Sequence, residues 1–107
     1  MATTPSVTHH VAATLRGIAA ELGFLPELAQ QWDQEPDSSK ASWQLEWEEL
    51  LARLTRIAQE ERAGTLAAAE RMQYTSAIRD LLKSAPTLAQ LGVQIPPALI
   101  ALCPRAG

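Results

Sequence analysis

Apolar residues recur at helical spacing through the middle of the chain. One stripe is spaced four, three, four and three residues apart: Trp43, Trp47, Leu50, Leu54 and Ile57. This spacing is typical of a helix that packs lengthwise on another helix. A second stripe follows: Ala67, Tyr74, Ile78, Leu81 and Ala85. Between the stripes, Gly64 can end one helix in a left-handed conformation and Thr65 can cap the next. The pattern predicts an antiparallel helical hairpin over residues 40–85.

The same segment is also compatible with one long helix. A glycine such as Gly64 costs only about 1 kcal/mol inside a helix. A continuous rod over residues 40–85 would then need a partner chain to cover its apolar stripe. We favour the hairpin because Gly64 and Thr65 supply both a stop and a start, but the sequence leaves this choice open.

The first 34 residues predict a pair of helices. A stripe of apolar side chains runs to Gly23, which we expect to end the first helix: Val7, Val11, Leu15, Ile18 and Leu22. Pro26 suits the first turn of a short second helix that carries Leu28, Ala29 and Trp32. Residues 35–39 then predict an acidic loop, because Pro36 disfavours a helix and Asp and Ser favour turns.

The last 22 residues predict a proline-bounded tail. Pro86 stops the preceding helix, Gly92 ends one further helical turn, and a short helix follows Pro96 and Pro97. The tail is apolar, with Val93, Ile95, Leu99, Ile100 and Leu102. It must cover the hairpin or be covered by a partner.

Composition supports one all-α domain over residues 1–107. The chain has 19 Ala and 15 Leu but only 8 Val and Ile together. Ala and Leu favour helices, whereas β-branched residues favour strands. We therefore expect a small helical bundle built on the hairpin, with the N-terminal helix pair and the C-terminal tail packed against it.

Charge is spread unevenly along the sequence. Residues 20–49 hold eight acidic residues and one base, Lys40, a net charge of −7. Residues 50–107 hold four acidic and seven basic residues, a net charge of +3. Such a dipolar surface can orient a partner protein or a second copy of the chain. Because the whole chain is acidic, with a net charge of −3, it argues against nucleic-acid binding.

Residues 14–32 carry one resemblance to a known family. Ala19, Gly23, Ala29 and Trp32 occupy the spacing of the small residue, turn glycine and later apolar residues in the helix-turn-helix of bacterial regulators. The segment resembles that family, which implies a transcriptional regulator as the alternative function. It departs from the family where DNA would be read, since the second helix would present Glu27, Gln30, Gln31 and Asp33 and no cation.

No segment predicts catalysis, a cofactor or a metal site. His9 and His10 are adjacent and point about 100° apart on a helix, whereas metal-binding pairs share one face. Glutamates at helical spacing, such as Glu46 and Glu49, usually solvate an outer face. No glycine-rich phosphate loop or nucleophile elbow occurs. We expect a protein that is not an enzyme.

The expected cellular compartment is inferred from three features that the sequence lacks: a pair of cysteines, a secretory signal and a membrane span. Cys103 is the only cysteine, which fits a reducing compartment. The first ten residues do not form a secretory signal, and no apolar run approaches the length of a membrane span. We expect a cytoplasmic protein that does not enter a membrane.

The three tryptophans are the leading candidates for binding, since Trp is enriched where binding energy concentrates. They are also compatible with a place in the core of the bundle. Together with the tail they form the predicted partner-binding set: Trp32, Trp43, Trp47, Ile95, Leu99 and Leu102. We expect a protein–protein interaction module, an adaptor or a chaperone-like subunit of a larger assembly. Its partner would be another protein or a second copy of itself.

Overall fold

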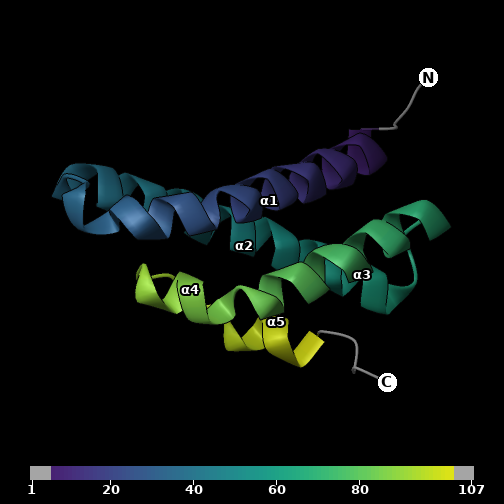
Figure 1. Cartoon of the computed structure of the whole chain (residues 1–107). Coiled ribbons are helices and arrows are strands. Elements are labelled where there is room, and N and C mark those ends of the chain that lie inside the picture. Colours follow the sequence, from purple (N-terminus) through teal and green to yellow (C-terminus); the bar gives the residue numbers. More distant parts are fainter. Residues whose placement is uncertain (1–5, 103–107) are drawn as a thin grey trace.

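The computed structural model describes the backbone of residues 6–102 and the side chains of residues 10–101 (Figure 1). It contains these elements: α1 (Ser6–Gln31), the 3-10 turn η1 (Trp32–Gln34), α2 (Asp37–Ala63), α3 (Ala68–Lys83), α4 (Ala85–Gln90) and α5 (Pro97–Leu102). No strand occurs between residues 6 and 102. The predicted all-α class is confirmed.

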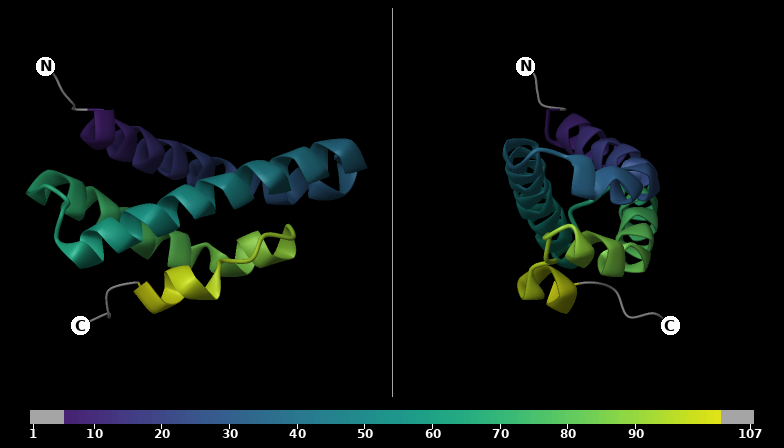
Figure 2. Two further views of the ribbon diagram at one scale, coloured as in Figure 1. Left: turned by 180° about the vertical axis from the view of Figure 1, so that it is seen from behind. Right: turned by 60° about the vertical axis from the view of Figure 1, so that its left-hand side comes forward.

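The chain runs back and forth along one long direction. α1 and α2 run in opposite senses, α3 and α4 return, and α5 turns back beside them (Figure 2). α3 packs most extensively against α1, and α5 packs against α2. The bundle measures 48 × 37 × 20 Å, so its two ends are well separated.

A glycine motif separates α2 from α3, as the hairpin prediction required. Gly64 has a φ of 78°, in the left-handed region. The amide of Thr65 donates to the carbonyl of Glu60 at 3.0 Å, and that of Gly64 donates to Glu61 at 3.1 Å. These two bonds form a Schellman motif, which satisfies the last carbonyls of a helix. The alternative of one continuous rod is therefore wrong.

Thr65 has a different place from the one predicted. Its hydroxyl donates to the Glu60 carbonyl at 3.0 Å, so it stabilises the end of α2 rather than the start of α3. α3 instead begins after Ala67, whose amide donates to the Oε1 of Glu70 at 2.8 Å. A glutamate in the third helical position commonly accepts this bond.

The predicted N-terminal helix pair is wrong, because α1 continues through Gly23 and Pro26. Apolar side chains still face the interior beyond the glycine, where Leu25 is buried and Ala29 is half-buried. Burial of this continuing stripe offsets the cost of about 1 kcal/mol for glycine and about 3 kcal/mol for an interior proline. The turn that a helix-turn-helix needs is therefore absent from residues 14–32.

The acidic loop predicted over residues 35–39 is shorter than expected. α2 already begins at Asp37, and Pro36 lies just outside it with φ −62° and ψ 151°. The amide of Lys40 donates to the carbonyl of Pro36 at 3.0 Å, which closes the first turn. Asp37 also suits this position, because a carboxylate is favourable at a helix N-terminus.

The core lies between α1, α2 and α3 and extends under the tail. Its largest fully buried side chains are these: Trp47, Tyr74, Ile18, Leu51, Leu54, Leu81, Leu88 and Leu99. Six of the ten residues of the two predicted seams are buried. The other four are less so: Trp43, Leu50 and Ala85 are half-buried and Ala67 is exposed. The side chain of Val7 lies outside those described.

A side-chain hydrogen bond links the start of the tail to α2. Gly92 has a φ of 87°, and the amide of Val93 donates to the carbonyl of Leu88 at 2.8 Å. The Nε2 of Gln44 on α2 donates to the carbonyl of Leu91 at 2.9 Å. A Cβ at Gly92 would displace the end of the Gln44 side chain from this bond, and the positive φ independently favours glycine.

Candidate functional site

The three tryptophans form one row at the end of the bundle where α1 meets α2. Trp43 and Trp47 lie one turn apart on α2, and η1 returns the chain so that Trp32 lies beside Trp43. The ring centroids of Trp32 and Trp43 are 5.3 Å apart in a T-shaped arrangement. Those of Trp43 and Trp47 are 6.1 Å apart and tilted by 57°. Both are favourable aromatic geometries.

The three tryptophans of this row differ in how deeply their side chains are buried. Trp47 is 0% exposed and belongs to the core. Trp32 and Trp43 are half-buried and pack against that core from outside. The prediction that Trp47 binds a partner is therefore wrong for this conformation, because the bundle covers the whole side chain. Trp32 and Trp43 keep surface that a partner can reach.

The tail residues of the predicted set also separate by burial. Leu99 is 0% exposed, so it closes the core and offers no surface to a partner. Ile95 is half-buried against the same core. The backbone of Leu102 belongs to α5, but its side chain lies outside those described.

Acidic residues lie near Trp32 and Trp43 along the chain. Asp33 follows Trp32 directly, Asp37 begins α2, and Glu46 lies one turn beyond Trp43, all three exposed. The one cation of this segment, Lys40, has its Nζ 5.4 Å from the centre of the Trp32 ring. The Lys40 ammonium group therefore already lies against the face of the Trp32 ring, in a segment whose other charged residues are acidic.

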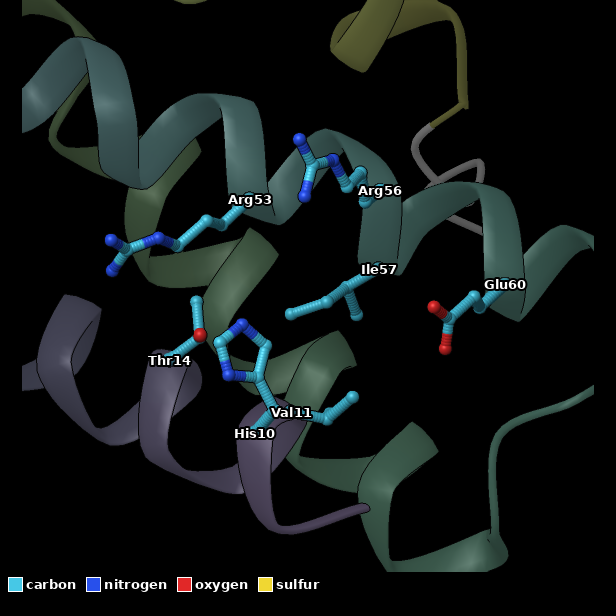
Figure 3. Close-up of a pocket in the computed structure, with 7 residues that line it drawn as sticks. All are labelled: His10, Val11, Thr14, Arg53, Arg56, Ile57 and Glu60. Carbon is cyan, nitrogen blue, oxygen red and sulfur yellow. The ribbon is translucent and has the colours of Figure 1, made fainter. Parts of the chain in front are cut away.

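A second feature is a hollow of about 360 Å³ between α1 and α2, here called the α1–α2 cleft (Figure 3). His10, Val11 and Thr14 line it from α1. Arg53, Arg56, Ile57 and Glu60 line it from α2. Within each set the residues are one or three positions apart, so each set occupies one side of its helix. Sequence reasoning missed the site because nothing local indicates that two segments about 40 positions apart face each other.

A second hollow, of about 410 Å³, lies between α1 and α3. Leu15 and Ala19 line it from α1, and Met72 lines it from α3. Met72 is 74% exposed, the most exposed of the large apolar side chains described. Arg16 and Asp80 lie at its rim.

The structure gives the positions of some of the histidines and acidic residues considered as catalytic or metal-binding candidates. His10 is exposed, while the side chain of His9 and all of Cys103 lie outside the described residues. Within the described residues no group of three or more His, Cys, Asp or Glu side chains could hold a metal ion. Glu46 and Glu49 are exposed on α2, as the sequence indicated. Glu70, which sequence reasoning did not single out, is buried.

Comparison with protein-family models, curated proteins and solved structures finds no match to this chain. None of the helices described between residues 6 and 102 combines the length and apolar character that a membrane crossing requires. The function must therefore be argued from the residues and their geometry.

Proposed function

We propose that the protein is an interaction module, a subunit of a larger protein assembly, and that it binds a cationic segment of a partner protein on Trp32 and Trp43. The observation that supports this most is the position of these two rings. They lie half-exposed at one end of the bundle and pack, one after the other, against the fully buried Trp47.

The packing of the three rings on one another makes this surface suited to binding. Trp47 is fixed by the core, Trp43 packs on Trp47, and Trp32 packs on Trp43. The rings are therefore ordered before a partner arrives, and little side-chain entropy is lost on binding. Tryptophans in such positions carry a large share of the binding energy in protein interfaces.

The charges select the kind of partner. Residues 20–49, which include both exposed rings, carry a net charge of −7. An arginine or lysine from a partner would gain from this field and from contact with the ring faces, as Lys40 does on Trp32. An acidic segment would be repelled by the same field.

A second copy of the chain is a poorer occupant than a foreign cationic segment. Its arginines near the α2–α3 turn, Arg62 and Arg71, are interspersed with Glu60, Glu61 and Glu70. The chain as a whole carries −3, so two copies repel each other at long range. DNA is disfavoured by the same field and by the absence of a turn in α1.

The test uses a synthetic helical peptide of arginine, leucine and alanine, titrated into the full chain and followed by calorimetry. We expect a dissociation constant of about 1–100 μM that weakens as salt is raised, because the field is screened. The same peptide with glutamate in place of arginine should not bind. Absence of binding by the arginine peptide, or equal binding of both peptides, would contradict the proposal.

Two matched variants locate the binding surface. Trp43→Leu removes the central ring and retains an apolar side chain, and should weaken binding about tenfold or more. Leu82→Ala truncates an exposed apolar residue on α3, far from the row in sequence, and should leave binding unchanged. The helical content of both variants is checked first. Light scattering of the protein without peptide completes the test. If the protein is a dimer and Trp43→Leu converts it to a monomer, a second copy of the chain occupies this surface. That result would overturn the assignment of the surface to a cationic segment of another protein.

A further inference from the structure

The α1–α2 cleft has three properties of a ligand site that the proposed function does not use. Its volume of about 360 Å³ lies at the lower end of the range for small-molecule pockets. Its floor is apolar, formed by Val11 and Ile57, which are 3% and 4% exposed. Its polar groups come from two different helices, His10 and Thr14 from α1 and Arg53, Arg56 and Glu60 from α2 (Figure 3).

Two arginines at the cleft lack a counter-ion. Within residues 10–101, neither the Arg53 nor the Arg56 guanidinium lies within 4.0 Å of a carboxylate. The Glu49–Arg53 pair that helical spacing allows is therefore not formed. Both side chains are exposed, so their charge is available at the mouth of the cleft.

Thr14 provides the second, independent observation. It is 5% exposed and lines the cleft. The other helical threonines with described hydrogen bonds, Thr55 and Thr75, donate to the carbonyl four residues earlier at 2.8 and 2.9 Å. Thr14 makes no such bond, and its hydroxyl has no hydrogen-bond partner within the described part of the chain. Because the hydroxyl oxygen is not itself buried, it can donate a hydrogen bond to an acceptor bound in the cleft.

The polar groups are not evenly distributed around the cleft. Arg53, Thr14 and His10 lie toward one end, Ile57 lies in the middle, and Glu60 lies at the opposite end (Figure 3). An anionic group is thus attracted to the Arg53 end and kept away from Glu60. The apolar floor between them suits the uncharged body of the same ligand.

We propose that the α1–α2 cleft binds a small organic anion, with its carboxylate or phosphate at Arg53, Arg56 and Thr14 and its apolar body on Val11 and Ile57. Guanidinium groups bind both kinds of oxyanion through paired charge-assisted hydrogen bonds. The ring of His10 can donate a further hydrogen bond.

The test measures binding of three probes to the full chain by calorimetry and by the backbone amide signals of the cleft residues. Phenyl phosphate and hexanoate combine an anion with an apolar body and separate the two oxyanion types. Inorganic phosphate has the charge alone. We expect at least one organic probe to bind about tenfold or more tightly than inorganic phosphate, because it also buries apolar surface. Absence of binding by both organic probes at about 10 mM, or binding no tighter than that of inorganic phosphate, would overturn the proposal.

Variants distinguish binding in the α1–α2 cleft from nonspecific attraction of the anion to positive charge. Arg53→Gln and Arg56→Gln should each weaken binding about tenfold, as expected for a lost charge-assisted bond. Arg71→Gln makes the same change in net charge at an exposed arginine outside the cleft, and should have little effect. Glu60→Gln should strengthen binding, since it removes a repulsive charge. Equal weakening by Arg53→Gln and Arg71→Gln would overturn the site.

Thr14→Val gives a readout that a purely structural role would not produce. Replacing the hydroxyl by a methyl group should leave the melting temperature nearly unchanged, while the loss of a donor should weaken binding of the probe several-fold. A variant that keeps its melting temperature and binds the probe equally well would contradict the role of Thr14 as a ligand group.

Discussion

Truncation of Leu54 tests which face of α2 is buried. Leu54 is 0% exposed and lies in the centre of the helix, where it meets the core. Replacing such a side chain by alanine removes its buried methyl groups and leaves a cavity, at a cost of about 2–5 kcal/mol. A domain of this size has a total stability of about 5–15 kcal/mol, so Leu54→Ala should remove a large part of it.

The matched control is Leu45→Ala, the same chemical change on the same helix. Leu45 is 58% exposed, so little area returns to water and the cost should stay below about 1 kcal/mol. At roughly 4 °C per kcal/mol for about 100 residues, the melting temperature of Leu54→Ala should fall by about 8–20 °C and that of Leu45→Ala by under about 4 °C. Urea denaturation followed by circular dichroism measures both free energies of unfolding. Equal losses would refute the assignment of the buried face.

Three further predictions concern local contacts, each measured as a free energy of unfolding. Gly64→Ala should cost about 1–2 kcal/mol, because Gly64 has a positive φ. Gly92→Ala should cost more, because the added Cβ also displaces the Gln44 side chain. Equal costs of the two variants would contradict the close approach of Gln44 to Gly92. In the Gly92→Ala background, Gln44→Ala should cost almost nothing, since the hydrogen bond from Gln44 to Leu91 is already lost. If Gln44→Ala costs as much there as in the native background, Gly92→Ala does not break this bond. Glu70→Ala should cost about 1 kcal/mol through loss of the bond to the Ala67 amide, whereas Glu70→Gln keeps an acceptor and should cost less; the reverse order would exclude this capping role.

Much of the fold could be predicted from short-range patterns. The seam of α2 and the glycine stop at Gly64 are local signals, and the structure bears them out. Gly92 and the prolines of the tail were also interpreted correctly. Gly23 and Pro26 predict an end and a new start within the N-terminal segment, whereas α1 continues through both. The apolar repeat that continues through Leu22, Leu25 and Ala29 was the better signal, since burial along a long helix outweighs two unfavourable residues.

The candidate sites were harder to predict, for a physical reason. Helical spacing shows which residues share a face, but not which face meets a neighbouring helix and which meets water. Trp43 and Trp47 share one stripe, yet Trp47 is fully buried and Trp43 is not. The α1–α2 cleft depends on Thr14 and Arg53 facing each other, and this follows only from how the helices pack.

The most direct test of the proposed binding surface is a nitrogen–proton correlation spectrum of the indole groups during addition of the arginine peptide. Each tryptophan gives its own side-chain signal, so the three rings are observed separately. We predict that the signals of Trp32 and Trp43 shift with added peptide, while that of Trp47, whose Nε1 is buried, stays nearly constant. Shifts of all three signals alike, or of none while the peptide binds, would show that the exposed tryptophans are not the binding surface.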